Sequence, residues 1–106
     1  MAAIENPASG VRVKWHLTAA DTDGALLRFE LWVPPGGAGP HADLHTEERF
    51  ELMAGTMGLE RGNERLELTR GQRATVPPGV ARRWGNAGDD ELHVMVEVAP
   101  ALEVTR

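Results

Sequence analysis

The sequence predicts an all-β fold, and three observations support this class. Apolar and polar side chains alternate along several short segments, which is the pattern of a strand with one buried face. Turn-forming residues interrupt these segments at intervals of roughly 8 to 12 residues, as in a β-sandwich or barrel. The 12 glycines and 7 prolines among 106 residues leave no room for a helix beyond about three turns. We therefore expect about eight or nine short strands that close into a sandwich or barrel.

The N-terminal third contains the two most regular strand patterns. Residues 1–10 have no periodicity, and we expect them to form an irregular arm. Residues 11–17 and 27–33 alternate apolar with polar side chains, and the Asp-Thr-Asp-Gly sequence of residues 21–24 predicts a turn between them. Residues 34–40 predict a loop, because their three prolines lack the N–H group that a strand ladder requires.

The strands expected in the rest of the chain are shorter. Residues 46–54 are compatible with a strand or with a helix that has Thr46 as its N-cap and Gly55 at its end. The strand rhythm on both sides favours the strand. We expect further strands over residues 55–60, 64–69, 74–76, 80–84 and 92–98.

Composition limits the classes of partner. A chain of 106 residues is the size of one domain, and we expect a single domain over residues 1–106. The formal charge of −5 argues against nucleic acid and anionic membranes as main partners. The absence of cysteine excludes disulfides and thiolate chemistry. No apolar run approaches the length of a membrane span or a secretion signal, so we expect a cytoplasmic protein.

Residues 36–55 contain the densest group of side chains that could carry chemistry. His41, Asp43, His45, Glu47 and Glu48 fall within eight residues. Imidazoles and carboxylates at such spacing can bind a divalent metal, although an acidic surface loop has the same composition.

Strand parity separates the two glutamates of this segment. Glu48 shares its side of the strand with Phe50 and Leu52, whereas Glu47 and Glu51 point to the other side. We expect Phe50 and Leu52 to be buried together with Leu27, Phe29 and Leu31. A carboxylate directed into that core needs a metal, a cation or hydrogen-bond donors.

Two motifs resemble those of the cupin family, whose members are small β-barrels of the jelly-roll type. In the first, over residues 36–55, the sequence His41-Ala42-Asp43 is followed by Glu48 and Gly55 at the family's spacing. In the second, over residues 71–86, the matching residues are Gly71, Pro77-Pro78-Gly79, Arg82 and Asn86. The resemblance covers residues 26–100 and implies a single small cupin barrel.

The resemblance also implies positions for metal ligands. Carried over from the two motifs, these positions are His41, Asp43, Glu48 and Arg82. Asp43 replaces a histidine of the family pattern and can still donate an oxygen. Arg82 replaces the histidine of the second motif and cannot bind a metal, because a guanidinium stays protonated.

Arg82 leads to two alternative predictions. If its side chain points inward, as its parity with Val80 and Trp84 indicates, it pairs with Glu48 or Asp43 and weakens metal binding. If it points outward and His45 moves inward, then His41, Asp43, His45 and Glu48 form a metal site. Such nitrogen and oxygen ligands would suit Fe, Mn, Ni or Zn.

Three classes of function follow from these motifs. The first is an enzyme acting on a small acidic or enolisable molecule, with Glu48 or His41 as general base and Arg82 and Trp84 binding the substrate. The second is a non-catalytic domain whose Arg82 anchors an acidic ligand. The third is a structural or dimerisation domain with a filled barrel. The resemblance also implies a homodimer formed through the sheets, to which residues 1–17 could contribute.

Overall fold

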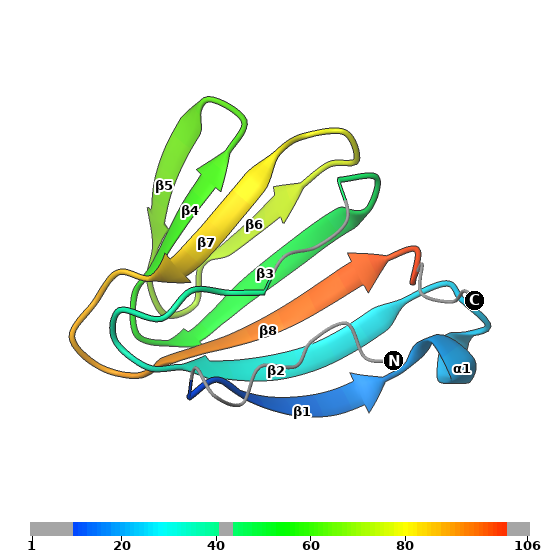
Figure 1. The fold of residues 1–106 in the computed structure, drawn as a ribbon, viewed down its shortest axis with the longest axis horizontal. Helices are drawn as coiled ribbons and strands as arrows, with labels where there is room; N and C mark the ends of the chain where they lie inside the picture. The colour runs from blue at the N-terminus through cyan, green and yellow to red at the C-terminus, as the bar shows by residue number, and fades with distance from the viewer. Residues whose placement is uncertain (1–9, 41–43, 102–106) are drawn as a thin grey trace.

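The computed structural model describes residues 10–40 and 44–101, and these residues form two antiparallel sheets (Figure 1). The larger sheet has the strand order β1-β2-β8-β3-β6, and the smaller has the order β5-β4-β7. The bounds are β1 Arg12–Leu17, α1 Ala19–Thr22, β2 Leu27–Val33, β3 Glu47–Ala54, β4 Met57–Arg61, β5 Glu64–Leu68, β6 Arg73–Val76, β7 Arg82–Asn86 and β8 Leu92–Ala99. The prediction of an all-β protein is confirmed.

The core lies between the sheets and follows the predicted strand parity. Along β8, each second residue from Leu92 to Val98 is buried. Phe50 and Leu52 are buried together with Phe29 and Leu31, as expected, although Leu27 is only half-buried. The smaller sheet closes the core from the opposite side with Met57, Leu59, Leu68 and Trp84.

The pairing of β3 resolves the choice between strand and helix for residues 46–54. β3 pairs with β8 on one side and with β6 on the other, and its burial alternates from Glu48 to Leu52. These two ladders satisfy the backbone hydrogen bonds of β3 as a strand. The alternative of a helix over residues 46–54 is therefore wrong.

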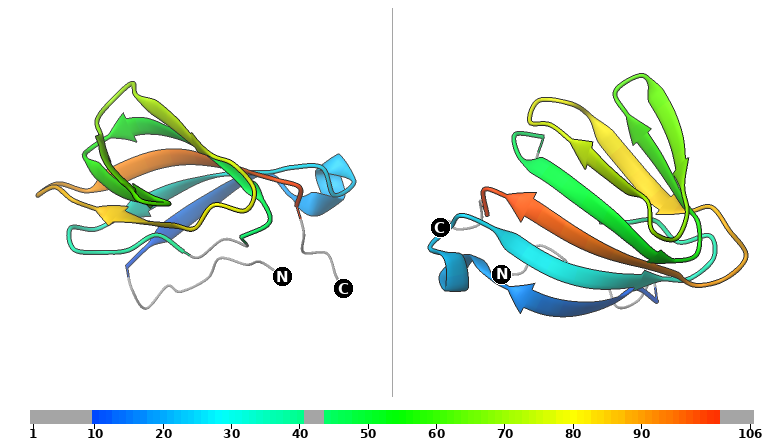
Figure 2. Two further views of the ribbon diagram at one scale, coloured as in Figure 1. Left: turned by 90° about the horizontal axis from the view of Figure 1, so that it is seen from above. Right: turned by 180° about the vertical axis from the view of Figure 1, so that it is seen from behind.

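Helix α1 occupies part of the turn expected at residues 21–24. Thr18 and Asp21 form a capping box at its N-terminus, and Asp23 adopts the left-handed conformation with φ of 57° at its end. Gly24 then accepts a hydrogen bond of 2.9 Å from the N–H of Ala101. This contact places α1 beside the end of the described chain, as the views in Figure 2 show. Helix α1 has four residues, and none of the helices in the described part of the chain is a candidate membrane span.

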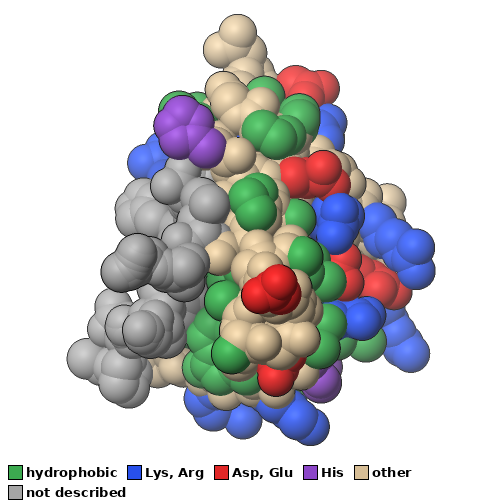
Figure 3. Space-filling view, turned by 90° about the vertical axis from the view of Figure 1, so that its right-hand side faces the viewer, with side chains coloured by type: hydrophobic (Ala, Val, Ile, Leu, Met, Phe, Trp, Pro, Cys, Tyr) green, Lys and Arg blue, Asp and Glu red, His purple; other side chains and the backbone are tan. Residues whose placement is uncertain are grey.

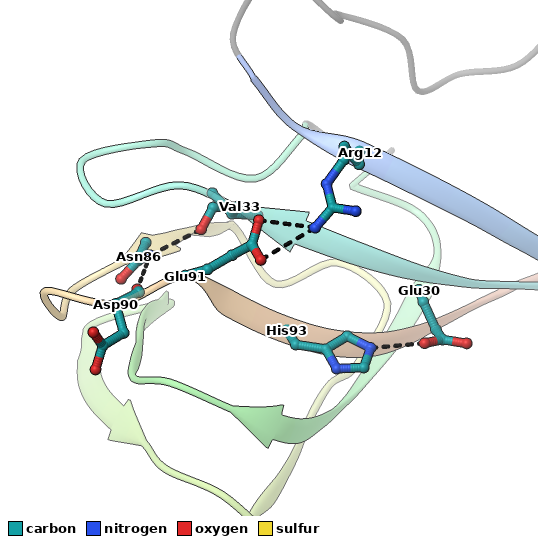
Figure 4. A network of polar contacts seen from close by, with 7 residues as sticks. All are labelled: Arg12, Glu30, Val33, Asn86, Asp90, Glu91 and His93. Atoms are coloured by element: carbon teal, nitrogen blue, oxygen red, sulfur yellow. Dashed lines mark hydrogen bonds and ion pairs between the residues drawn. The ribbon is translucent and has the colours of Figure 1, made fainter.

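The loop expected over residues 34–40 adds backbone pairing to the smaller sheet. Ala38 forms an antiparallel bridge with Gly85, and the N–H of Gly39 donates to the carbonyl of Trp84 at 2.8 Å. The side chain of Asn86 donates to the carbonyls of Val33 and Asp90 at 2.9 and 2.8 Å (Figure 4). These bonds join the end of β2 and the start of β8 to the strand that carries the second motif.

Candidate functional site

Two oppositely charged side chains face each other in the interior. Glu48 lies near the start of β3, and Arg82 is the first residue of β7, so they come from different sheets. Their side chains are only 3% and 4% exposed, and Arg82 Nη1 lies 3.5 Å from Glu48 Oε1. This ion pair confirms that Arg82 points inward toward Glu48. The alternative in which Arg82 folds outward is wrong.

Backbone carbonyls hold the guanidinium of Arg82 in this position. Its Nε and Nη2 donate to the carbonyl of Val80 at 3.2 and 3.0 Å, and Nη2 also donates to Pro77 at 3.1 Å and Leu44 at 3.5 Å. The turn between β6 and β7 brings these carbonyls together, because Gly79 adopts a φ of +86°. Neutral acceptors therefore bind most of the guanidinium, and its charge is opposed mainly by Glu48.

Burial changes the protonation of Glu48. Loss of water around the carboxyl group raises the pKa of Glu48 from 4.5 to about 7, although the nearby charge of Arg82 opposes that rise. Both protonation states of Glu48 are therefore populated near neutral pH. A carboxyl group with such a pKa can accept or donate a proton under physiological conditions.

Three buried polar atoms at this site lack a hydrogen-bond partner among the described residues. They are Glu48 Oε1, Arg82 Nη1 and Trp84 Nε1. Trp84 lies two residues after Arg82 on the inner face, and its ring packs edge-on against Phe50 with a centroid distance of 5.4 Å. Oε1 and Nη1 attract each other as charges but are not hydrogen-bonded at 3.5 Å. A buried polar group without a hydrogen bond costs about 1–3 kcal/mol, so this acceptor and these two donors favour a ligand or water that bonds to them.

The structure describes only some of the other predicted site residues. His41 and Asp43 lie outside the described residues, so their predicted roles as ligand or base stay predictions. His45 is exposed just before β3. Glu47 and Glu51 keep partly exposed side chains that pair with Arg49 and Arg73.

The described part of the site does not fit a metal. Among the described residues, no group of three His, Cys, Asp or Glu side chains could hold a metal ion. Arg82 occupies the position that the resemblance assigns to a fourth ligand, and its positive charge lies beside the only described carboxylate of the predicted set. A dication at this point would be repelled by Arg82 and would compete with it for Glu48.

Arg61 is a second arginine at this end of the barrel, and sequence reasoning missed it. It is the cross-strand partner of Arg82 in the pairing of β4 with β7. Its parity with Met57 and Leu59, both buried, was a signal that could have identified it. The strands expected over residues 55–60 and 64–69 leave Arg61 in the connection between them, where strand parity does not predict the direction of a side chain.

A separate polar network covers the outer face of the larger sheet. Glu30 lies between His16 and His93 and is hydrogen-bonded to both. Its Oε1 is 2.7 Å from His93 Nε2 (Figure 4). These hydrogen bonds lower the pKa of Glu30. His93 also stacks on Trp32, with a centroid distance of 4.5 Å. Because these side chains face away from the core, His93 belongs to the outer surface and does not line the barrel.

Two surface hollows lie apart from the Glu48–Arg82 pair. One of about 600 Å³ lies over β4, β5 and β7, and one of about 360 Å³ lies over β3, β6 and β8. Neither is lined by Glu48 or Arg82. Figure 3 views the right-hand side of Figure 1 and shows hydrophobic side chains along the middle of that face, with many charged ones to one side.

The family of this protein follows from its sequence as well as its fold. The family model described as the cupin domain matches residues 29–98. The chain therefore belongs to the cupin family. No curated protein matches its sequence.

Solved cupin structures share the fold at low sequence identity. A Cupin 2 conserved barrel domain protein from Salinispora arenicola has a TM-score of 0.73 and 18% identity, over 88% of this chain and 78% of that chain. A predicted oxalate decarboxylase from Thermotoga maritima has a TM-score of 0.75 and 17% identity, over 85% and 80%. A recombinant oxalate oxidase in complex with glycolate has a TM-score of 0.71 and 20% identity. The match to the oxidase covers 88% of this chain and 52% of the oxidase chain, so this chain spans about half the length of that chain.

Proposed function

We propose that this cupin domain binds a small organic acid in the barrel interior, with Arg82 as the anchor for the acid group. The observation that carries this proposal is a set of three buried atoms without a hydrogen-bond partner among the described residues, Glu48 Oε1, Arg82 Nη1 and Trp84 Nε1. The first two attract each other as an ion pair across 3.5 Å. A carboxylate offers acceptors to the guanidinium and the indole N–H. A hydroxyl or protonated oxygen of the same ligand offers a donor to Glu48.

The same site supports proton transfer. Glu48, with a pKa of about 7, is suited to take a proton from the carbon next to the carbonyl group of a bound acid. The C–H electron pair then forms the carbon–carbon double bond of an enolate, and the carbonyl oxygen takes the negative charge. Arg82 stabilises that oxygen, and the protonated Glu48 returns the proton when the enolate collapses. His41 remains a second candidate for the base, from outside the described residues.

The solved relatives support an acidic ligand. One relative was solved with glycolate, and another is described as a predicted oxalate decarboxylase. Both names refer to small carboxylic acids.

A second candidate function is a scaffold without a ligand. It is favoured by the burial of Glu48 and Arg82, which are 3% and 4% exposed, and by the apolar side chains packed between the sheets. In that case the ion pair is a structural clamp, and the barrel acts through its surfaces.

Nuclear magnetic resonance of the indole N–H groups distinguishes the two functions. The chain has three tryptophans, and Trp84→Phe assigns the Trp84 signal. Titration with pyruvate, glycolate or oxalate should shift the Trp84 signal and leave that of Trp32, on the outer face, unchanged. Arg82→Met should weaken binding at least tenfold, about 1.4 kcal/mol. Arg83→Met, at an outward position with 74% exposure, is the matched control.

A second measurement tests proton transfer at the same site. Pyruvate in heavy water should exchange its methyl protons faster with the parent protein, and Glu48→Gln should abolish that increase. If none of the three acids shifts the Trp84 signal at millimolar concentration, the scaffold function is the correct one.

A further inference from the structure

Arg61 and Arg82 place two guanidinium groups on neighbouring strands at the same end of the barrel. Their Cα atoms are direct partners in the antiparallel pairing of β4 with β7. Directly opposed residues on one face have Cβ atoms about 4.5–5.5 Å apart. Both side chains share the inner parity of their strands, with Leu59 and Trp84 as the next pair toward the core.

The side chain of Arg61 crosses from the smaller sheet to the larger one. Its Nη1 donates to the carbonyl of Thr75 on β6 at 2.9 Å, and its Nε donates to Glu64 Oε1 at 2.8 Å. It is 26% exposed, so it stands at the rim while Arg82 stands further inside at 4%. Within the described part of the chain, Nη2 of Arg61 makes no hydrogen bond, which leaves its donors available.

Two adjacent guanidiniums are not needed to hold the sheets together. The bond to the Thr75 carbonyl requires a donor but no positive charge, and a glutamine could also donate. Like charges at directly opposed positions destabilise a strand pair. The described carboxylates facing the two arginines are Glu48, inside, and Glu64, whose side chain is 61% exposed. The rim is therefore a place where an additional anion gains from both arginines.

We propose that Arg61 determines specificity by binding the second anionic group of a dicarboxylate, whose first carboxylate is bound by Arg82. This inference rests on the proposed function, because it requires an acid at Arg82. It adds that the ligand carries two negative groups, one bound inside and one bound at the rim. Arg61 thereby selects dicarboxylates over acids with a single charge.

The test compares acids that differ by one charge at nearly constant size. Malonate and succinate are titrated against their monoamides, malonamate and succinamate, by calorimetry. In the parent protein, at least one dicarboxylate should bind tenfold or more tightly than its monoamide. Arg61→Gln should weaken the dicarboxylate at least tenfold and leave the monoamide within twofold. Arg83→Gln removes one charge from the outer face of the same sheet and should leave the preference intact.

The outcomes separate this inference from the proposed function. Equal affinity for acid and monoamide in the parent overturns the role of Arg61, and so does an equal loss for both in Arg61→Gln. In either case, binding that is lost in Arg82→Met still supports the proposed function. If no acid and no monoamide binds the parent, both proposals are wrong. Arg61→Lys retains the charge and should retain the preference. If Arg61→Gln does not fold, Arg61→Met removes the same charge and should lose the preference, and a preference retained in Arg61→Met overturns the role of Arg61.

Discussion

At the scale of single residues, Glu48 determines how this site responds to pH. Because its pKa rises from 4.5 to about 7 on burial, the folded protein binds a proton more tightly than the unfolded chain does. The resulting contribution to the free energy of unfolding is complete below pH 4.5. It is lost as the pH rises through 7. The full loss is on the order of 3 kcal/mol.

Glu48→Gln should remove this pH dependence. In urea denaturation from about pH 5 to about pH 8, the parent should lose stability relative to Glu48→Gln as the pH rises. Glu67→Gln, on the exposed outer side of β5, should follow the parent. A constant difference between parent and Glu48→Gln over this range would show that Glu48 does not titrate near neutral pH.

Arg82 provides a second prediction at this scale. Arg82→His replaces a fixed positive charge with a neutral nitrogen donor at the position of a fourth metal ligand. We expect the affinity for Ni, Zn or Mn to rise at least tenfold, about 1.4 kcal/mol, measured by metal titration. Metal-free Arg82→His should also be less stable, because Glu48 loses its cation. Arg83→His should change neither quantity. Equal metal affinity in all three proteins would contradict the assignment of the second motif.

At the scale of elements, the pairing of residues 37–39 with β7 shapes the site. Gly39 packs directly against the ring of Trp84. A Cβ atom at position 39 would come within 2.1 Å of the ring carbon Cε2. Asn86 N–H donates to the carbonyl of Gly37 at 2.9 Å and continues the pairing. This segment therefore covers the tryptophan of the site and determines where its ring can lie.

Gly39→Ala should displace either this segment or the ring. We expect a loss of about 1–3 kcal/mol in the free energy of unfolding, because inserting a methyl group into a packed interior causes strain. A shift in tryptophan fluorescence should accompany that loss. Gly58→Ala is the control, since its Cβ would lie 3.4 Å from that of Ala87, and we expect a change within about 0.5 kcal/mol. Equal stability of both variants would mean that the contact with Trp84 relaxes freely.

At the scale of the whole molecule, the outer face of the larger sheet is the surface we expect to form a homodimer. It mixes positive and negative side chains, such as Arg49 beside Glu47 and Glu97. Trp32 and Met95 are half-buried on the same face. Two copies related by a two-fold axis can place opposite charges against each other, and the apolar side chains add buried area.

Light scattering at concentrations on the order of tens of micromolar should therefore report a dimer. Arg49→Glu should shift the protein toward monomer, because it reverses a charge on this face. Arg65→Glu, on the outer face of the smaller sheet, should not. A monomeric parent would contradict the dimer, and dissociation by Arg65→Glu alone would assign the interface to the other sheet.

The sequence by itself determined the strands, their buried sides and the inward direction of Glu48 and Arg82. These are local properties, because a strand with one buried face repeats its pattern every two residues and turn residues mark its ends. The resemblance to the cupin motifs also predicted that the strand with Glu48 would face the strand with Arg82. Strand ends were less certain, and β7 begins at Arg82 and extends to Asn86 instead of ending at residue 84.

Only the tertiary structure decided which side chains meet across the fold. The pairing of Arg61 with Arg82, the packing of Gly39 on Trp84 and the position of Glu30 between two histidines all join residues from different strands or loops. Such contacts depend on the register between strands. Register is set by long-range pairing and by loop geometry, and a shift of one residue would turn every side chain to the opposite face. The alternating pattern within one strand therefore carries no information about its partners.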